Sequence, residues 1–115
     1  MMAHRKQRVK CPLNGKTYNI DIEIMLLVAE IWNQGIYTTE SCQGGQGSAC
    51  IPEGCSEPAY VSFNSITDAE WLWNLIKRKR WGLILTQDTT RTGWTVHFNP
   101  DKISAVYKII KKEIK

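Results

Sequence analysis

The stretch DIEIMLLVAEIWNQGIYTTESCQGGQG, residues 21–47, carries a helix, a strand and a glycine-rich turn in direct succession. Its apolar side chains recur at helical spacing, at Ile24, Leu27, Val28 and Ile31. We expect Asp21 to cap this helix, with Glu23 in the first turn, and Gly35 to end it. Residues 36–41 are typical of a strand, and residues 42–58 of a long loop that holds three glycines within residues 44–47. This succession predicts a mixed α/β chain.

Further strands are indicated on both sides of this stretch. Residues 8–11 and 16–20 flank Asn14-Gly15, a strong signal for a hairpin turn. Residues 59–63 form another β-like run. Residues 83–87 and 94–98 flank a polar turn that contains glycine, and this arrangement predicts a second hairpin.

Two more helices complete the pattern. Residues 67–70, Thr-Asp-Ala-Glu, have the form of a capping box before the apolar side chains of a second helix. We expect Asn99 to cap a third helix with Pro100 at its first position, and helical spacing continues from there to the end of the chain. We therefore expect an α+β fold, with a small antiparallel or mixed sheet of four to six strands and three helices packed on it.

The length of 115 residues fits one domain spanning residues 1–115, with residues 1–7 as a basic, flexible tail. No apolar run approaches the roughly 20 residues that a membrane helix needs. The basic N-terminus lacks the apolar segment of a secretory signal. We expect a cytoplasmic protein without a membrane partner, in which the four cysteines are thiols or metal ligands.

The net charge of +4 is concentrated in three basic blocks, residues 5–10, 77–80 and 108–115. Such blocks form a footprint for anions, including nucleic acid. Basic residues in the last turn of a helix also complement its dipole, and two of the three blocks lie at expected helix ends. The basic blocks can therefore be interpreted either as solvated helix ends or as an anion-binding face.

The glycine-rich loop is the strongest candidate for a ligand site. Consecutive backbone N–H groups bind anions, and hydroxyl groups and a thiol lie beside them here. This candidate cradle comprises Thr39, Ser41, Cys42, Gln43, Gly44 and Gly45. Trp81 follows a basic block, and an indole beside guanidinium groups stacks a base while a phosphate is held. The residues expected to clamp such a ligand are Arg78, Arg80 and Arg91, and His97 completes the candidate set. The five tryptophans also fit a core or a dimer interface.

The cysteines allow two further hypotheses. Zinc prefers thiolates separated by two to four residues, and only Cys50 and Cys55 fit that spacing. A zinc site would add Cys42 and either Cys11 or a histidine, whereas buried free thiols are the alternative that we favour. Cys42 as a nucleophile needs His97 as its base, and this requires the last strand to neighbour the strand before the loop.

The segment from Cys11 to Phe63 resembles a set of small bacterial and phage proteins with a Gly-Ile-x-Thr-x-x-Ser-Cys-Gln motif. The matching residues are Cys11, Pro12, Ile20, Asp21, Ile31, Trp32, Gly35, Ile36, Thr38 or Thr39, Ser41, Cys42, Gln43 and Phe63. A fainter similarity leads to the wybutosine-synthesis tRNA methyltransferases, whose comparable segment reads Thr-x-Ser-Cys-Ser-Gly-Arg. This chain has Gln43 and Gly44 there and lacks the arginine. The resemblance implies a shared α/β scaffold.

Three functions remain open from the sequence. The first is a phage or bacterial protein that captures a phosphate-bearing nucleotide and sequesters a defence signal, where the phage link comes from the resemblance. Capture needs no general base, so we favour a role without catalytic residues or cofactors. The alternatives are an RNA-binding or RNA-modifying domain and an inhibitor that binds a host defence complex through its tryptophans. A homo-oligomer is compatible with each of the three.

Overall fold

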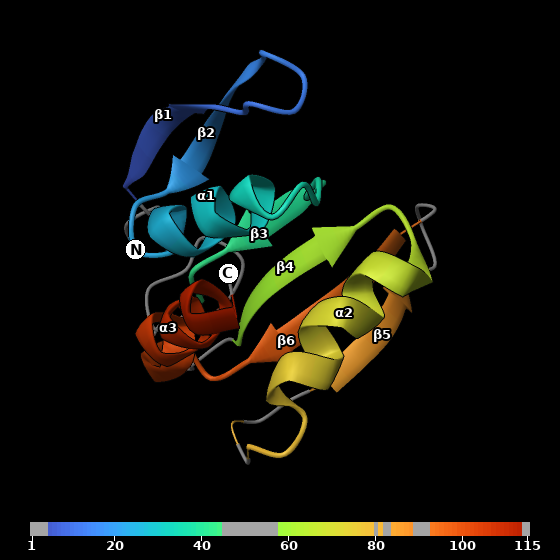
Figure 1. Cartoon of the computed structure of the whole chain (residues 1–115). Coiled ribbons are helices and arrows are strands. Elements are labelled where there is room, and N and C mark those ends of the chain that lie inside the picture. The colour runs from blue at the N-terminus through green and yellow to red at the C-terminus, as the bar shows by residue number, and fades with distance from the viewer. Residues whose placement is uncertain (1–4, 45–57, 80, 82–83, 89–92, 114–115) are drawn as a thin grey trace.

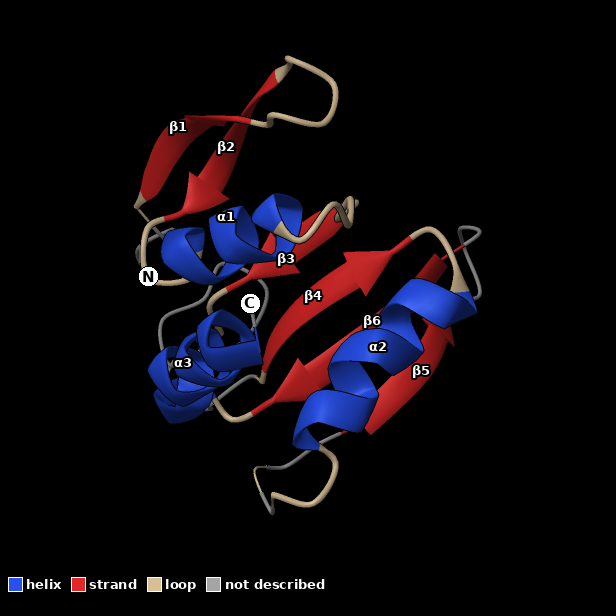
Figure 2. Ribbon diagram, in the orientation of Figure 1, coloured by secondary structure: helices blue, strands red, loops and turns tan. Residues whose placement is uncertain are grey.

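A computed structural model describes residues 5–44, 58–79, 81, 84–88 and 93–113. Within these residues the fold is α+β, as predicted, with three α-helices, a four-stranded antiparallel sheet and a separate two-stranded hairpin (Figure 1 and Figure 2). The elements are β1 (Lys6–Lys10), β2 (Thr17–Asp21), α1 (Met25–Asn33), β3 (Glu40–Cys42), β4 (Ala59–Phe63), α2 (Ile66–Ile76), β5 (Ile84–Asp88), β6 (Gly93–Phe98), the 3-10 turn η1 (Pro100–Lys102) and α3 (Ile103–Glu113).

The main sheet has the strand order β3-β4-β6-β5, and each neighbouring pair is antiparallel. Strands β4 and β5 therefore run parallel, with β6 between them and α2 in the connection, which makes a split β-α-β unit. Helix α2 packs on β4 and β6, and α3 packs on both α1 and α2. The helices cover one face of the sheet (Figure 2).

Strand periodicity separates the two faces of this sheet. On the helix-covered face, the paired residues Val61 and Val96 are fully buried, as are Ala59 and its partner Phe98. The opposite face carries the polar residues of the same strands. There Ser62 Oγ lies 2.7 Å from its cross-strand partner Thr95 Oγ1.

The first hairpin forms where the sequence predicts it. The Gly15 backbone has a φ of +73°, and the Cys11 N–H donates to the Lys16 carbonyl at 2.8 Å. Strand β1 starts at Lys6, two residues before the expected Arg8, so the last two residues of the expected flexible tail belong to a strand. The hairpin contacts the rest of the protein through β1 against α1 and β2 against β3.

Helix α1 ends as expected but begins later. Gly35 adopts a φ of +84°, and its N–H donates to the Trp32 carbonyl at 2.8 Å. The prediction that Asp21 caps the helix is wrong, because α1 starts at Met25 after Ile24 and has no side-chain cap. Asp21 instead ends β2 in a turn, where its carbonyl accepts the N–H of Ile24 at 3.1 Å.

Strand β3 is shorter than the expected run of residues 36–41, because only residues 40–42 pair with β4. Thr38 is turned into the core, where its Oγ1 accepts a hydrogen bond of 2.9 Å from the buried Trp32 Nε1. A buried indole N–H requires such a partner. The side chain of Thr38 therefore serves the core rather than an extended strand.

The other helix starts are close to those expected. The cap of α2 is Ser65 rather than Thr67, and its Oγ accepts the Asp68 N–H at 3.2 Å. Pro100 occupies the first position of η1 rather than of α3, which begins at Ile103, and Asn99 precedes it without the expected side-chain cap bond. None of the helices described is long and apolar enough to cross a bilayer.

Candidate functional site

The segment after β3 is fixed by hydrogen bonds to the turn between β2 and α1. The Gln43 N–H donates to Asp21 Oδ2 at 3.0 Å, and the Glu23 N–H donates to Gln43 Oε1 at 3.0 Å. The Gly44 N–H donates to Cys42 Sγ at 3.4 Å, with Gly44 at a φ of +67°. Two N–H groups of the expected cradle thus already have acceptors within the protein.

Asp21 is the centre of this arrangement. Only 3% of its side chain is exposed, and its Oδ1 lies 3.1 Å from Lys6 Nζ. A buried carboxylate needs such donors, since unpaired charges are costly away from water. We conclude that Gln43 has a structural role in joining β3 to the β2–α1 turn.

A cavity of about 230 Å³ lies between β2 and β3, and we call it the β2–β3 cavity. It contains two residues of the expected cradle, Thr39 and Ser41. The aromatic side chains of Tyr18, Trp32 and Tyr60 also line it. Its remaining lining residues are Asn19, Ile20, Thr38 and Glu40. Hydroxyl groups and aromatic rings therefore meet in one place.

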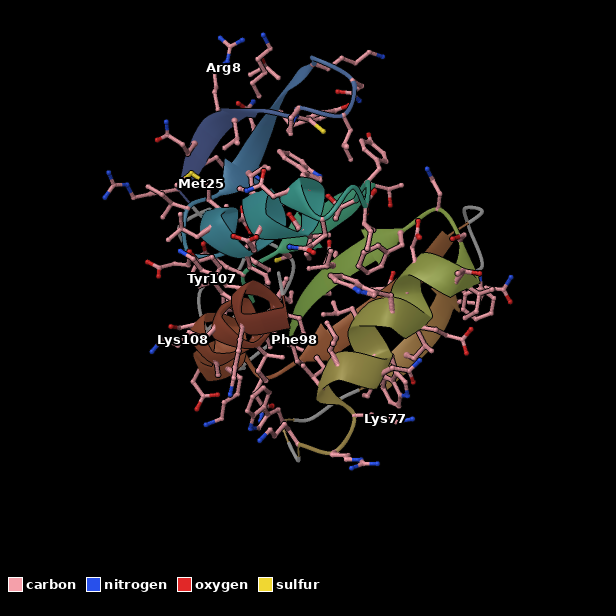
Figure 3. The ribbon with its side chains drawn as sticks, in the orientation of Figure 1. Arg8, Met25, Lys77, Phe98, Tyr107 and Lys108 are labelled. Carbon is pink, nitrogen blue, oxygen red and sulfur yellow. The ribbon has the colours of Figure 1, made fainter. Side chains whose placement is uncertain are left out.

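A second cavity of about 360 Å³, the α1–α3 cavity, contains two more of the described cradle residues, Gln43 and Gly44, whereas Cys42 lines neither cavity. Tyr107 lines it from the side of α3 that faces α1 (Figure 3). The rest of its lining comes from Glu23, Leu26, Leu27, Pro100, Asp101, Ile103 and Ser104. Two carboxylates make this cavity a poorer host for phosphate than the β2–β3 cavity, which has one.

His97 lies on the face of the sheet opposite the helices. The strand registers place Cys42, Tyr60 and His97 in one row across β3, β4 and β6. The Tyr60 and His97 rings are 5.8 Å apart, and His97 Nε2 lies 3.2 Å from Thr86 Oγ1. Because β4 separates the other two strands, Cys42 and His97 stand two strand spacings apart, about 10 Å. The fold does not provide the direct Cys–His contact that a nucleophile requires.

A shallow pocket of about 310 Å³ lies over this face, and His97 is one of its lining residues. The other lining residues are Glu40, Tyr60, Ser62, Thr86, Gln87 and Thr95. Glu40 and Tyr60 also line the β2–β3 cavity, so the two spaces adjoin.

The expected clamp at the end of α2 is separate from these cavities. Arg78 is exposed, and the Trp81 carbonyl accepts the Asn99 N–H at 2.7 Å. Lys79 Nζ lies 5.9 Å from the centre of the Trp81 ring, a cation–π contact. Neither Arg78 nor Trp81 lines the three cavities described above. Arg80, Arg91 and Gly45 lie outside the described residues.

The zinc hypothesis is tested only in part. Cys11 and Cys42 are both buried. Among the described residues, no group of three or more His, Cys, Asp or Glu side chains is placed to hold a metal. Cys50 and Cys55 lie outside the described residues, so a site that includes them remains a prediction.

A chain of hydrogen bonds joins the hairpin to the segment after α1. Asn14 Nδ2 donates to the Tyr18 hydroxyl at 2.8 Å, which lies 3.0 Å from the Tyr37 hydroxyl. The hydrogen bond with Tyr18, together with burial, raises the pKa of Tyr37 to about 12. The Tyr18–Tyr37 hydrogen bond therefore joins the β2 side of the β2–β3 cavity to the segment after α1.

Comparison of the chain with protein-family models, curated proteins and solved structures found no match. Sequence reasoning missed Tyr18, Asn19 and Tyr60 as cavity-lining residues. Alternation in β4 carried a usable signal, because Ala59, Val61 and Phe63 share the buried face and leave Tyr60 on the other. Nothing local indicated that β2 and β3 would form the two sides of one cavity.

Proposed function

We propose that this protein binds a small phosphate-bearing nucleotide in the β2–β3 cavity and acts by capture rather than catalysis. The observation that supports this most is the meeting of the Thr39 and Ser41 hydroxyls with the Tyr18 and Tyr60 rings in that cavity. Aromatic rings stack on bases whatever their sequence, and hydroxyl groups donate to phosphate or ribose oxygens.

The size of the cavity limits how the ligand enters. About 230 Å³ is below the roughly 300–1,000 Å³ of sites that enclose a drug-sized ligand. The cavity therefore accommodates one part of a nucleotide, such as the base, while the phosphate lies at the mouth. The net charge of +4 provides a favourable field for that anion. Together with the resemblance to phage proteins, capture supports a role in sequestering a host signalling nucleotide.

The experiment is calorimetric titration of the intact protein with a panel of linear and cyclic nucleotides and their parent nucleosides. The variant Thr39→Val/Ser41→Ala removes both hydroxyls, and Ser104→Ala is the matched control in the α1–α3 cavity. A hydrogen bond to a charged group contributes about 1.5–3 kcal/mol. The double variant should therefore bind at least about tenfold more weakly, while the control binds as the unmodified protein does.

Three results would contradict the proposal. Equal affinity for a nucleoside and its nucleotide would remove the phosphate from recognition. A loss confined to Ser104→Ala would place the ligand in the other cavity. Absence of binding by every member of the panel would refute nucleotide capture and leave RNA or a protein as the partner.

A further inference from the structure

The outer face of the β1–β2 hairpin carries a row of cations. Lys6, Arg8 and Lys10 alternate along β1, so they project from one face at intervals of about 6.7 Å. Their cross-strand partners are Asp21, Asn19 and Thr17. The other face holds Val9, Tyr18 and Ile20, which pack against the core. The hairpin is thus anchored to the core by one face and presents cations to solvent on the other.

Charge on this hairpin is strongly unbalanced. Residues 5–21 contain five cationic side chains and one carboxylate, Asp21. That carboxylate is buried, is paired with Lys6 and accepts the Gln43 N–H. It therefore does not neutralise Arg8 and Lys10, both of which are exposed. The Arg8 side chain points away from the body of the protein (Figure 3).

The composition of this face favours an anionic partner over an apolar one. Its six residues are four charged and two uncharged polar side chains, with neither aromatic nor aliphatic groups. Protein interfaces depend on aromatic and apolar anchors, whereas phosphate backbones are bound by lysine and arginine. The outer face therefore fits nucleic acid better than a protein surface.

The shape of the hairpin selects the kind of nucleic acid. Its two strands project beyond the helices and the main sheet (Figure 1). The major groove of B-DNA is about 12 Å wide and admits a two-stranded ribbon, whose strands lie about 4.8 Å apart. The major groove of duplex RNA is too narrow and deep for side chains to read.

We propose that the β1–β2 hairpin binds duplex DNA by inserting its outer face into the major groove. Arg8 and Lys10 contact phosphates, and Asn19, the cross-strand partner of Arg8, reaches a base edge. This activity goes beyond nucleotide capture and does not depend on it, although Asn19 also lines the β2–β3 cavity.

The test is fluorescence anisotropy of a labelled 20-base-pair DNA duplex titrated with the intact protein at several salt concentrations. Arg8→Gln/Lys10→Gln removes two cations from the hairpin. Lys108→Gln/Lys112→Gln is the matched control, because it removes two exposed cations from α3. Each lost phosphate contact reduces the slope of log K against log salt by about 0.9, so the hairpin variant should lower it by about 1.8. The control should leave the slope unchanged.

A third variant, Asn19→Ala, examines insertion separately from charge. It should weaken binding to the duplex without altering the salt slope, because a base contact releases no counterion. Duplex RNA and single-stranded RNA of matching sequence should bind more weakly than DNA. Four results would each overturn the proposal. The two double variants could change the salt slope equally, or Asn19→Ala could bind DNA as the unmodified protein does. The protein could also bind RNA as tightly as DNA, or bind no DNA.

Discussion

Replacing Asp21 with asparagine should destabilise the protein by about 2 kcal/mol. Asp21 accepts the Gln43 N–H through Oδ2 and pairs with Lys6 through Oδ1, with 3% of the side chain exposed. Asparagine has almost the same shape but carries only one acceptor oxygen, so its NH₂ group faces one of these two donors. One hydrogen bond to a charged group, worth about 1.5–3 kcal/mol, is lost or weakened. The Lys6 side chain is 54% exposed, so its ion pair adds at most about 1 kcal/mol.

The assay is thermal unfolding by circular dichroism, supported by urea unfolding at 25 °C. For a domain of 115 residues, 1 kcal/mol shifts the melting temperature by roughly 4 °C, so a decrease of about 8 °C is expected. Glu23→Gln is the matched control, because it makes the same chemical change on an exposed side chain, and the Glu23 hydrogen bond to Gln43 is made by its backbone N–H. That control should stay within about 0.5 kcal/mol of the unmodified protein. Equal effects of the two substitutions would refute the reasoning that Asp21 holds β3 to the β2–α1 turn.

Two further predictions concern the cap of α2 and the tyrosine pair. Ser65→Ala should lower the free energy of unfolding in urea by about 1 kcal/mol, because it leaves the Asp68 N–H without its acceptor. Thr67→Ala should lower it by less than about 0.5 kcal/mol. A larger decrease for Thr67→Ala than for Ser65→Ala would support the cap expected from the sequence. Folded Tyr37 keeps its proton to a pKa of about 12 and unfolded tyrosine to 10.0, so its contribution to stability is full below pH 10 and falls from pH 10 to 12. Tyr37→Phe should therefore lose less stability than the unmodified protein between pH 8 and pH 11 in urea unfolding, and parallel losses would contradict this.

Local patterns predicted most of the fold. Helical spacing and Gly35 located α1, and the turn signal at Asn14-Gly15 located the first hairpin. These elements depend on interactions within a few residues of each other, which a sequence displays directly. The predictions that were wrong concerned polar residues whose partners lie far away along the chain. Asp21 was expected to cap a helix but bonds to Gln43, which is 22 residues away along the chain.

The candidate site was predictable only as a region. Thr39, Ser41, Gln43 and Gly44 are consecutive or nearly so, yet the first two line one cavity and the last two another. Side chains alternate between the two faces of β3, and the chain turns after it, so residues that are neighbours in the sequence line different cavities. Which surroundings they reach depends on where β2 and α3 lie, and that is decided by packing across the whole chain.

The pairing of Cys42 with Tyr60 has a consequence for how this chain can change in length. The two residues are cross-strand neighbours, so the 17 residues that separate them in the sequence leave and rejoin the sheet at adjacent points. Lengthening a closed connection costs little, only about 0.6 kcal/mol for each doubling. The register of β3 against β4 is therefore largely independent of what joins them. The connection is a natural place to splice in a reporter domain, and a place where descendants of this chain can gain or lose residues while keeping the same sheet.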